Sequence, residues 1–99
     1  MLMFILFVLL TLCGWSMMST TAAHADGEEI YMTYCKSCHG KKGNLGLGGA
    51  AKLNKSKMPF DQRLIVVAEG KGKMAPFGKI LSEKEVEAVV QFTMKFGNE

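Results

Sequence analysis

Cys35-Lys36-Ser37-Cys38-His39 is the stretch that decides how this 99-residue chain folds. Two thiols lie three positions apart, and the imidazole of His39 directly follows the second thiol. This order is typical of the attachment site of a c-type haem, where each thiol bonds to one side of the porphyrin. The histidine then binds the iron from the proximal side. We therefore expect one covalently bound haem c with its iron.

The first 25 residues differ in composition from the rest of the chain. Leu2 to Leu12 is apolar except for Thr11, and Ala23-His24-Ala25 has the small-x-small pattern of a cleavage site. We expect residues 1–25 to be a signal peptide and residues 26–99 to be one haem-binding domain. Because no Lys or Arg precedes the apolar run, an uncleaved N-terminal anchor stays open, although the run is short for a membrane span. Lipid attachment at Cys13 is disfavoured, because Leu12 stands where a small residue is usual.

The size of residues 26–99 also favours a cofactor. A domain of this length is close to the lower limit for a self-sufficient hydrophobic core, and a covalently held haem fills that interior with apolar surface. Cys35 and Cys38 are the only cysteines in this part of the chain, and a disulfide between them would close only a very small loop. Export to the periplasm agrees with this chemistry, since bacteria attach c-type haem outside the cytoplasm.

Charge is distributed unevenly along the chain. Acidic residues gather towards the two ends of the domain, and nine lysines gather around the haem-binding segments. Seven of the nine acidic residues lie near these ends, namely Asp26, Glu28, Glu29, Glu83, Glu85, Glu87 and Glu99. The lysines are Lys36, Lys41, Lys42, Lys52, Lys55, Lys57, Lys71, Lys73 and Lys79. This arrangement agrees with an ordinary solvated surface, and also with a basic face that steers the protein towards acidic redox partners.

Three amphipathic segments predict an all-α fold. The spacing of apolar residues indicates helices over Gly27 to Ser37 and over Phe60 to Glu69. Ser82, followed three positions later by Glu85, forms the capping box of a third helix. The glycine-rich stretch from Gly40 to Gly49 predicts a sharply turning loop that lies close to a ligand. It lacks the Gly-Lys-Ser/Thr ending of a phosphate-binding loop.

The second axial ligand of the iron has several candidates. His39 is the only histidine in residues 26–99, which leaves Met, Lys, Tyr or an open position. Met32 lies too close to the attachment site within the first predicted helix, and Met94 lies on the last helix, where a core role is usual. Met58 and Met74 both lie in predicted loops, and the residues alone leave these two open.

From this point the chain resembles the small monohaem class I cytochromes c, in particular the short periplasmic high-potential cytochromes of bacteria. The segment Met74-Ala75-Pro76-Phe77-Gly78, with Leu81 and Ser82 following, resembles the ligand turn of that family. The resemblance implies three main helices wrapped around one haem. It implies Met74 as the distal ligand, with Met58 as the alternative. It also implies that Gly27 and Tyr31 meet Val89 and Phe92 where the first and last helices cross.

The chain departs from the family pattern in the loop that follows the motif. The family usually has a proline whose carbonyl accepts a hydrogen bond from the proximal histidine, whereas this chain reads Gly48-Gly49-Ala50-Ala51. We expect a carbonyl near Gly49 or Ala50 to take that role. The candidates for holding the haem propionates are Lys52, Asn54, Lys55 and Arg63.

The resemblance implies a soluble, periplasmic, one-electron carrier that has no catalytic turnover of its own. Its partners would be redox proteins with acidic docking surfaces, without nucleic acid or a small-molecule substrate, and with a membrane only if the N-terminus stays uncleaved. The main alternative is a haem enzyme or a gas or redox sensor with an open sixth iron position. A zinc site lacks an obvious fourth ligand, and a thiol–disulfide oxidoreductase would show a βαβ pattern.

Overall fold

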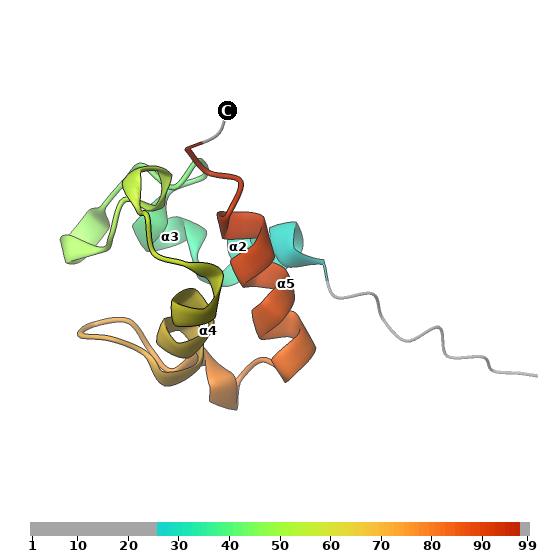
Figure 1. Ribbon diagram of the computed structural model, residues 1–99. Helices are drawn as coiled ribbons and strands as arrows, with labels where there is room; N and C mark the ends of the chain where they lie inside the picture. The colour runs from blue at the N-terminus through green and yellow to red at the C-terminus, as the bar shows by residue number, and fades with distance from the viewer. Residues whose placement is uncertain (1–25, 98–99) are drawn as a thin grey trace, which may run out of the picture.

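The computed structural model describes residues 26–97, which form an all-helical domain (Figure 1). The predicted signal peptide or anchor lies outside these residues. The α-helices are α2 (Gly27–Tyr34), α3 (Lys36–His39), α4 (Phe60–Glu69) and α5 (Glu83–Thr93). Short 3-10 turns connect them: η1 (Leu47–Gly49), η2 (Leu53–Lys55) and η3 (Phe77–Lys79). Within the described residues the only β-type pairing is an isolated bridge between Lys71 and Met74, and no helix of residues 26–97 has the length and apolarity needed to cross a membrane.

The first helix is divided at Cys35, which corrects the single helix predicted from Gly27 to Ser37. Asp26 caps α2 by accepting hydrogen bonds from the backbone N–H groups of Glu28 and Glu29. Cys35 has a φ of −112°, well away from the helical value, so α2 ends before it and α3 begins after it. The Cys35 N–H still donates to the Tyr31 carbonyl at 2.9 Å, which keeps the two helices in sequence.

The other two predicted helices are confirmed. Helix α4 spans Phe60–Glu69, with Pro59 at its N-cap, where the missing N–H of proline leaves no helical bond unmade. Helix α5 begins with the predicted capping box. The Ser82 hydroxyl accepts from the Glu85 N–H at 3.1 Å, and the Glu85 carboxylate accepts from the Ser82 N–H at 2.9 Å.

Helices α2 and α5 pack against each other at a position where α2 has no side chain. A Cβ atom built on Gly27 would lie 2.1 Å from the Ala88 carbonyl oxygen. Tyr31, one turn further along α2, packs its ring against Phe92 and Phe96, with ring centroids 5.2 Å and 5.1 Å away. The predicted contact of the first and last helices is therefore confirmed, and a backbone carbonyl of α5 is what requires the glycine.

The buried apolar residues of the described part form a small core. They are Ile30, Tyr31, Leu81, Val86, Val89 and Val90, which belong to α2, α5 and the residue pair before α5. Apolar side chains of the other elements pack against this core but are only partly buried. Those half-buried residues include Cys35, Leu53, Leu64 and Phe77. The domain thus has its own core around α2 and α5. The apolar side chains of its other elements are only partly covered by protein.

We predict that Gly27→Ala lowers the free energy of unfolding of the haem-loaded protein by about 1–3 kcal/mol, the usual cost of overpacking. Its Cβ would force α2 and α5 apart. The measurement is denaturant unfolding followed by circular dichroism. Because the clash is with a backbone oxygen, adding Ala88→Gly should not restore stability. A Gly27→Ala protein as stable as the wild type would contradict this packing.

Candidate haem-binding site

The attachment motif lies on the short helix α3 and the residue before it. Cys35 is half-buried at the junction of α2 and α3, and Cys38 is exposed within α3. Burial raises the pKa of the Cys35 thiol to about 11. Neither thiol is engaged in a disulfide, and α3 carries His39 directly after the second cysteine.

One ring nitrogen of His39 is held by the glycine-rich loop. His39 Nδ1 lies 2.8 Å from the Ala51 carbonyl oxygen, and because a carbonyl only accepts, Nδ1 carries the proton. This bond leaves Nε2 as the unprotonated nitrogen, which is the form that binds a metal. The expected carbonyl near Gly49 or Ala50 is therefore corrected to Ala51. Gly48 and Gly49 both adopt positive φ, so the turn is complete only after Ala50.

A buried tyrosine holds the chain directly after His39. The Tyr31 hydroxyl donates to the Gly40 carbonyl at 2.5 Å, and Tyr31 is fully buried. Desolvation by burial, with a smaller contribution from Cys35, raises the pKa of Tyr31 to about 12. The sequence pattern indicates only a packing role for Tyr31. A hydroxyl on a residue destined for the core is the signal that indicates such a bond, because a buried hydroxyl needs a partner.

Met74 lies in a turn whose backbone folds back on itself. The Met74 N–H donates to the Lys71 carbonyl at 2.9 Å, and the Lys71 N–H donates to the Met74 carbonyl at 3.2 Å. Gly70 has a φ of 78°, and a Cβ atom there would lie 2.6 Å from the Met74 carbonyl oxygen. Glycine is thus required at this position for the close approach of the two backbone segments. The Met74 side chain is half-buried.

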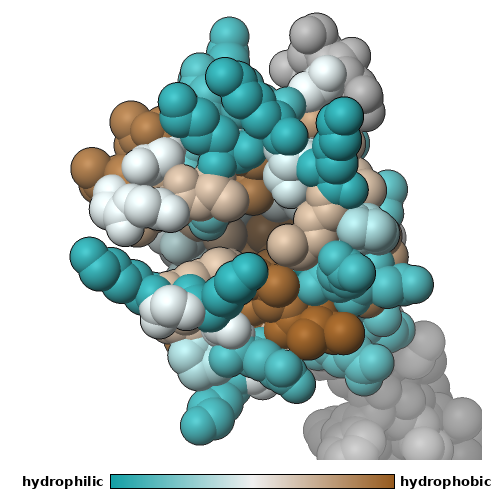
Figure 2. Space-filling view, turned by 60° about the vertical axis from the view of Figure 1, so that its left-hand side comes forward, coloured by the Kyte–Doolittle hydropathy of each residue, from teal (hydrophilic) through white to brown (hydrophobic). Residues whose placement is uncertain are grey.

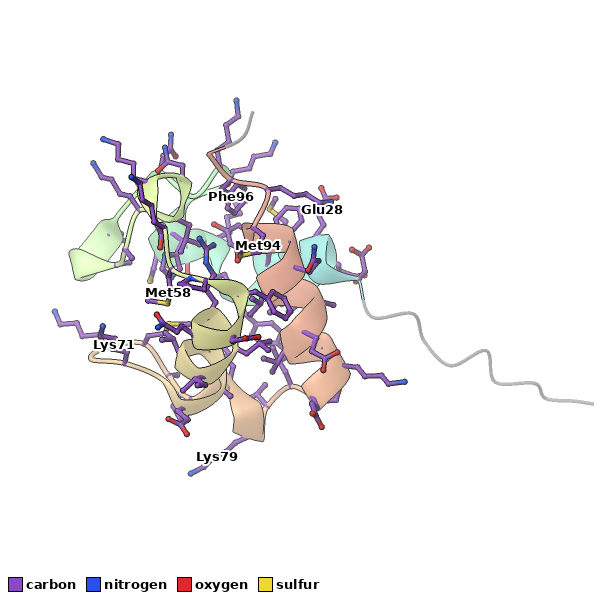
Figure 3. The ribbon with its side chains drawn as sticks, viewed as in Figure 1. Glu28, Met58, Lys71, Lys79, Met94 and Phe96 are labelled. Carbon is purple, nitrogen blue, oxygen red and sulfur yellow. The ribbon has the colours of Figure 1, made fainter. Side chains whose placement is uncertain are left out.

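Met58 is the other methionine in a loop, and it is also half-buried. Its side chain lies in the space between the part that holds α3 and the Lys71 turn (Figure 3). The burial of the two side chains therefore does not show which of Met58 and Met74 is the distal ligand. Met32, which lies within α2, is half-buried against the core.

The surroundings of the motif fit a haem. Figure 2 shows a hollow that opens between two parts of the molecule. Asn54, one of the predicted propionate-binding residues, has a buried side-chain oxygen without any hydrogen-bond partner in the described residues. Since the oxygen and nitrogen of an amide are interchangeable by rotation, this position suits a donor to an anionic group such as a propionate. Of the other candidates, Lys52 and Lys55 are exposed, whereas Arg63 is buried.

Other proteins share this fold and motif. Residues 22–92 match a family model described as cytochrome c oxidase, cbb3-type, subunit III, and the chain belongs to this family of c-type cytochrome domains. A cytochrome c6 of Synechococcus sp. is 29% identical over 92 residues, which cover 87% of this chain and 82% of that protein. A solved structure, the KustC0563 c-type cytochrome, matches with a TM-score of 0.66 and 34% identity over 72% of this chain and 96% of that chain.

These findings define the class of protein. The chain is a small class I monohaem cytochrome c with the all-α fold of that family. It carries covalently bound haem c with iron, and Cys35 and Cys38 fit the attachment motif. Its function is haem-based electron transfer with redox protein partners.

We predict that Ala51→Pro stabilises the loop that holds His39, by about 0.4–1 kcal/mol in the free energy of unfolding. Proline keeps the carbonyl that His39 uses, and the Ala51 N–H donates no backbone hydrogen bond within the described residues. Ala50 has φ −59° and ψ 140°, a conformation favoured before proline. Ala50→Pro is the matched control and should destabilise, because the Ala50 N–H donates to the Leu47 carbonyl at 3.1 Å. Equal effects of the two prolines would refute the prediction.

We predict that Tyr31→Phe lowers the free energy of unfolding by about 1 kcal/mol at neutral pH, since it removes one buried hydrogen bond. The raised pKa of Tyr31 means that the fold favours the protonated phenol. This contribution is complete below pH 10 and is lost as the pH rises towards 12. The difference in stability between wild type and Tyr31→Phe should therefore shrink over that range in denaturant titrations. The exposed Tyr34→Phe is the control, and a pH-independent difference for Tyr31→Phe would contradict the linkage.

Proposed function

We propose that His39 and Met74 are the two axial ligands of the iron, and that Cys35 and Cys38 form the two thioether bonds. With both axial positions filled, the protein acts as a one-electron carrier and has no catalytic turnover of its own. The observation that carries the proposal is the hydrogen bond from His39 Nδ1 to the Ala51 carbonyl, which fixes the tautomer that leaves Nε2 free. Haem c supplies the ferric/ferrous couple.

The position of His39 is supported from both directions along the chain. Tyr31 holds the Gly40 carbonyl on one side, and Ala51 holds the imidazole on the other. A ligand restrained in this way needs little rearrangement when the charge at the iron changes. Such restraint suits a protein whose task is to exchange electrons rapidly.

Met74 is proposed as the distal ligand because its turn is held by two backbone hydrogen bonds and by the close approach of Gly70. A thioether is a soft and neutral ligand that favours ferrous iron, so it raises the reduction potential. It also occupies the coordination position that a haem enzyme or gas sensor would need open. Met58 remains the alternative, since its side chain is equally half-buried.

The partners are proposed to be redox proteins with acidic docking surfaces. Every lysine in residues 26–97 is exposed, and hydrophilic side chains lie along the lower side of the hollow in Figure 2. Two large apolar side chains of the glycine-rich loop, Leu45 and Leu47, are 52% and 58% exposed. A basic surface with exposed apolar residues suits brief docking. The charges steer the encounter with the partner, and the small interface that forms dissociates readily.

Residues 1–25 are proposed to be a signal peptide that directs residues 26–99 to the periplasm. The apolar run and the Ala23-His24-Ala25 pattern support this. N-terminal sequencing of the secreted holoprotein distinguishes a cleaved signal from an uncleaved anchor on the outer face of the inner membrane.

We predict that Met74→Ala lowers the reduction potential, abolishes the ferric sulfur-to-iron charge-transfer band and lets external ligands such as carbon monoxide bind the reduced iron. Loss of the soft ligand removes its preference for ferrous iron. Met58→Ala is the matched control and should keep the band and the potential. If Met58→Ala loses both while Met74→Ala keeps them, the two assignments are reversed.

A further inference from the structure

Arg63, on α4, is the one charged residue among the buried side chains of residues 26–97, with 7% of its surface exposed. Its guanidinium makes four hydrogen bonds. Nε donates to the Met58 carbonyl at 2.8 Å, and Nη2 donates to the Ser56 carbonyl at 3.1 Å. Nη1 donates to both the carbonyl and the hydroxyl of Thr93, each at 3.2 Å.

These bonds join α4 to the segment directly before it and to the distant end of α5. Ser56 and Met58 belong to the segment before α4, and Thr93 ends α5, 30 residues away from Arg63. The Thr93 hydroxyl in turn donates to the Val90 carbonyl at 2.7 Å, which fixes it as an acceptor for Arg63. Arg63 thus holds the segment that carries Met58 against the core helix α5.

The charge of Arg63 is not matched by a carboxylate. All four acceptors are neutral, namely three carbonyls and one hydroxyl. Burial lowers the pKa of Arg63, but a guanidinium stays protonated in proteins at ordinary pH. A buried charge without a counterion costs folding free energy. If Arg63 only joined the segment before α4 to α5, apolar side chains would do so at a lower cost in stability. A buried positive charge, in contrast, destabilises the more positive ferric state relative to the ferrous state.

We propose that Arg63 is a positioning residue of the electron-transfer site, which fixes the Ser56–Pro59 segment onto α5 and raises the reduction potential through its buried positive charge. This inference rests on the proposed function. Arg63 is not an iron ligand, so part of the preference for ferrous iron would come from a side chain of α4.

The test compares four variants of the full haem-loaded protein. Arg63→Gln and Arg63→Met remove the charge, and Arg63→Lys keeps the charge but loses the planar fork. Lys84→Gln removes an exposed charge from α5 and serves as the control. The reduction potential is measured by spectroscopic titration in 0.1 M and 1 M NaCl, and thermal unfolding is recorded for each variant.

We expect both neutral variants to shift the equilibrium towards ferric iron by about tenfold, which is 59 mV for a one-electron couple. The shift should persist in 1 M NaCl, because buried charges are poorly screened. Arg63→Lys should unfold at a lower temperature yet stay within about threefold of the wild-type equilibrium. Lys84→Gln should change the equilibrium less than twofold, and that change should vanish in 1 M NaCl.

The inference is overturned if Arg63→Gln and Arg63→Met unfold earlier but keep the wild-type potential, since Arg63 would then be only a structural link. If neither neutral variant holds haem, the reduction potential of Arg63→Lys tests the inference. A tenfold fall in that variant, despite its retained charge, overturns the inference, and a potential near the wild type supports it. Failure of the Met74 proposal would be seen separately, as the absence of the sulfur-to-iron band from the wild type or its persistence in Met74→Ala.

Discussion

The contact between α2 and α5 is the constraint on which the rest of the domain depends. Gly27 lets α2 approach the Ala88 carbonyl, and this approach brings Tyr31 between the rings of Phe92 and Phe96. The hydroxyl of Tyr31 then reaches the Gly40 carbonyl, directly after His39. A residue that lacks a side chain therefore determines, through one buried tyrosine, where the haem-binding histidine lies.

The same packing leaves the domain incomplete without its cofactor. Among the described residues, six apolar side chains around α2 and α5 are buried, while others such as Leu53, Leu64 and Phe77 are only partly buried. Asn54 has a buried side-chain oxygen with no hydrogen-bond partner within the same residues. A covalently bound haem, which brings both apolar surface and propionates, suits these features together. The cofactor thus supplies part of the core as well as the redox centre.

The sequence predicted what depends on local patterns. Helix α4, the Ser82–Glu85 capping box and the meeting of Gly27 and Tyr31 with α5 are all confirmed. Cys35 and Cys38 fit the haem attachment motif of the family. The break at Cys35 and the Ala51 carbonyl were not predicted correctly, because each depends on backbone torsions. The bonds of Arg63 to Thr93 span 30 residues, so only the tertiary structure brings them together. The choice between Met58 and Met74 stays a prediction from the family resemblance.

Spectroscopic redox titration of the full chain, expressed with haem-attachment machinery, tests the His39 and Met74 ligation most directly. We expect a reversible one-electron c-type spectrum at positive potential, with the sulfur-to-iron charge-transfer band in the ferric protein. A negative potential without that band would contradict the assignment. The iron would then have an open or different sixth position, as a haem enzyme or sensor requires.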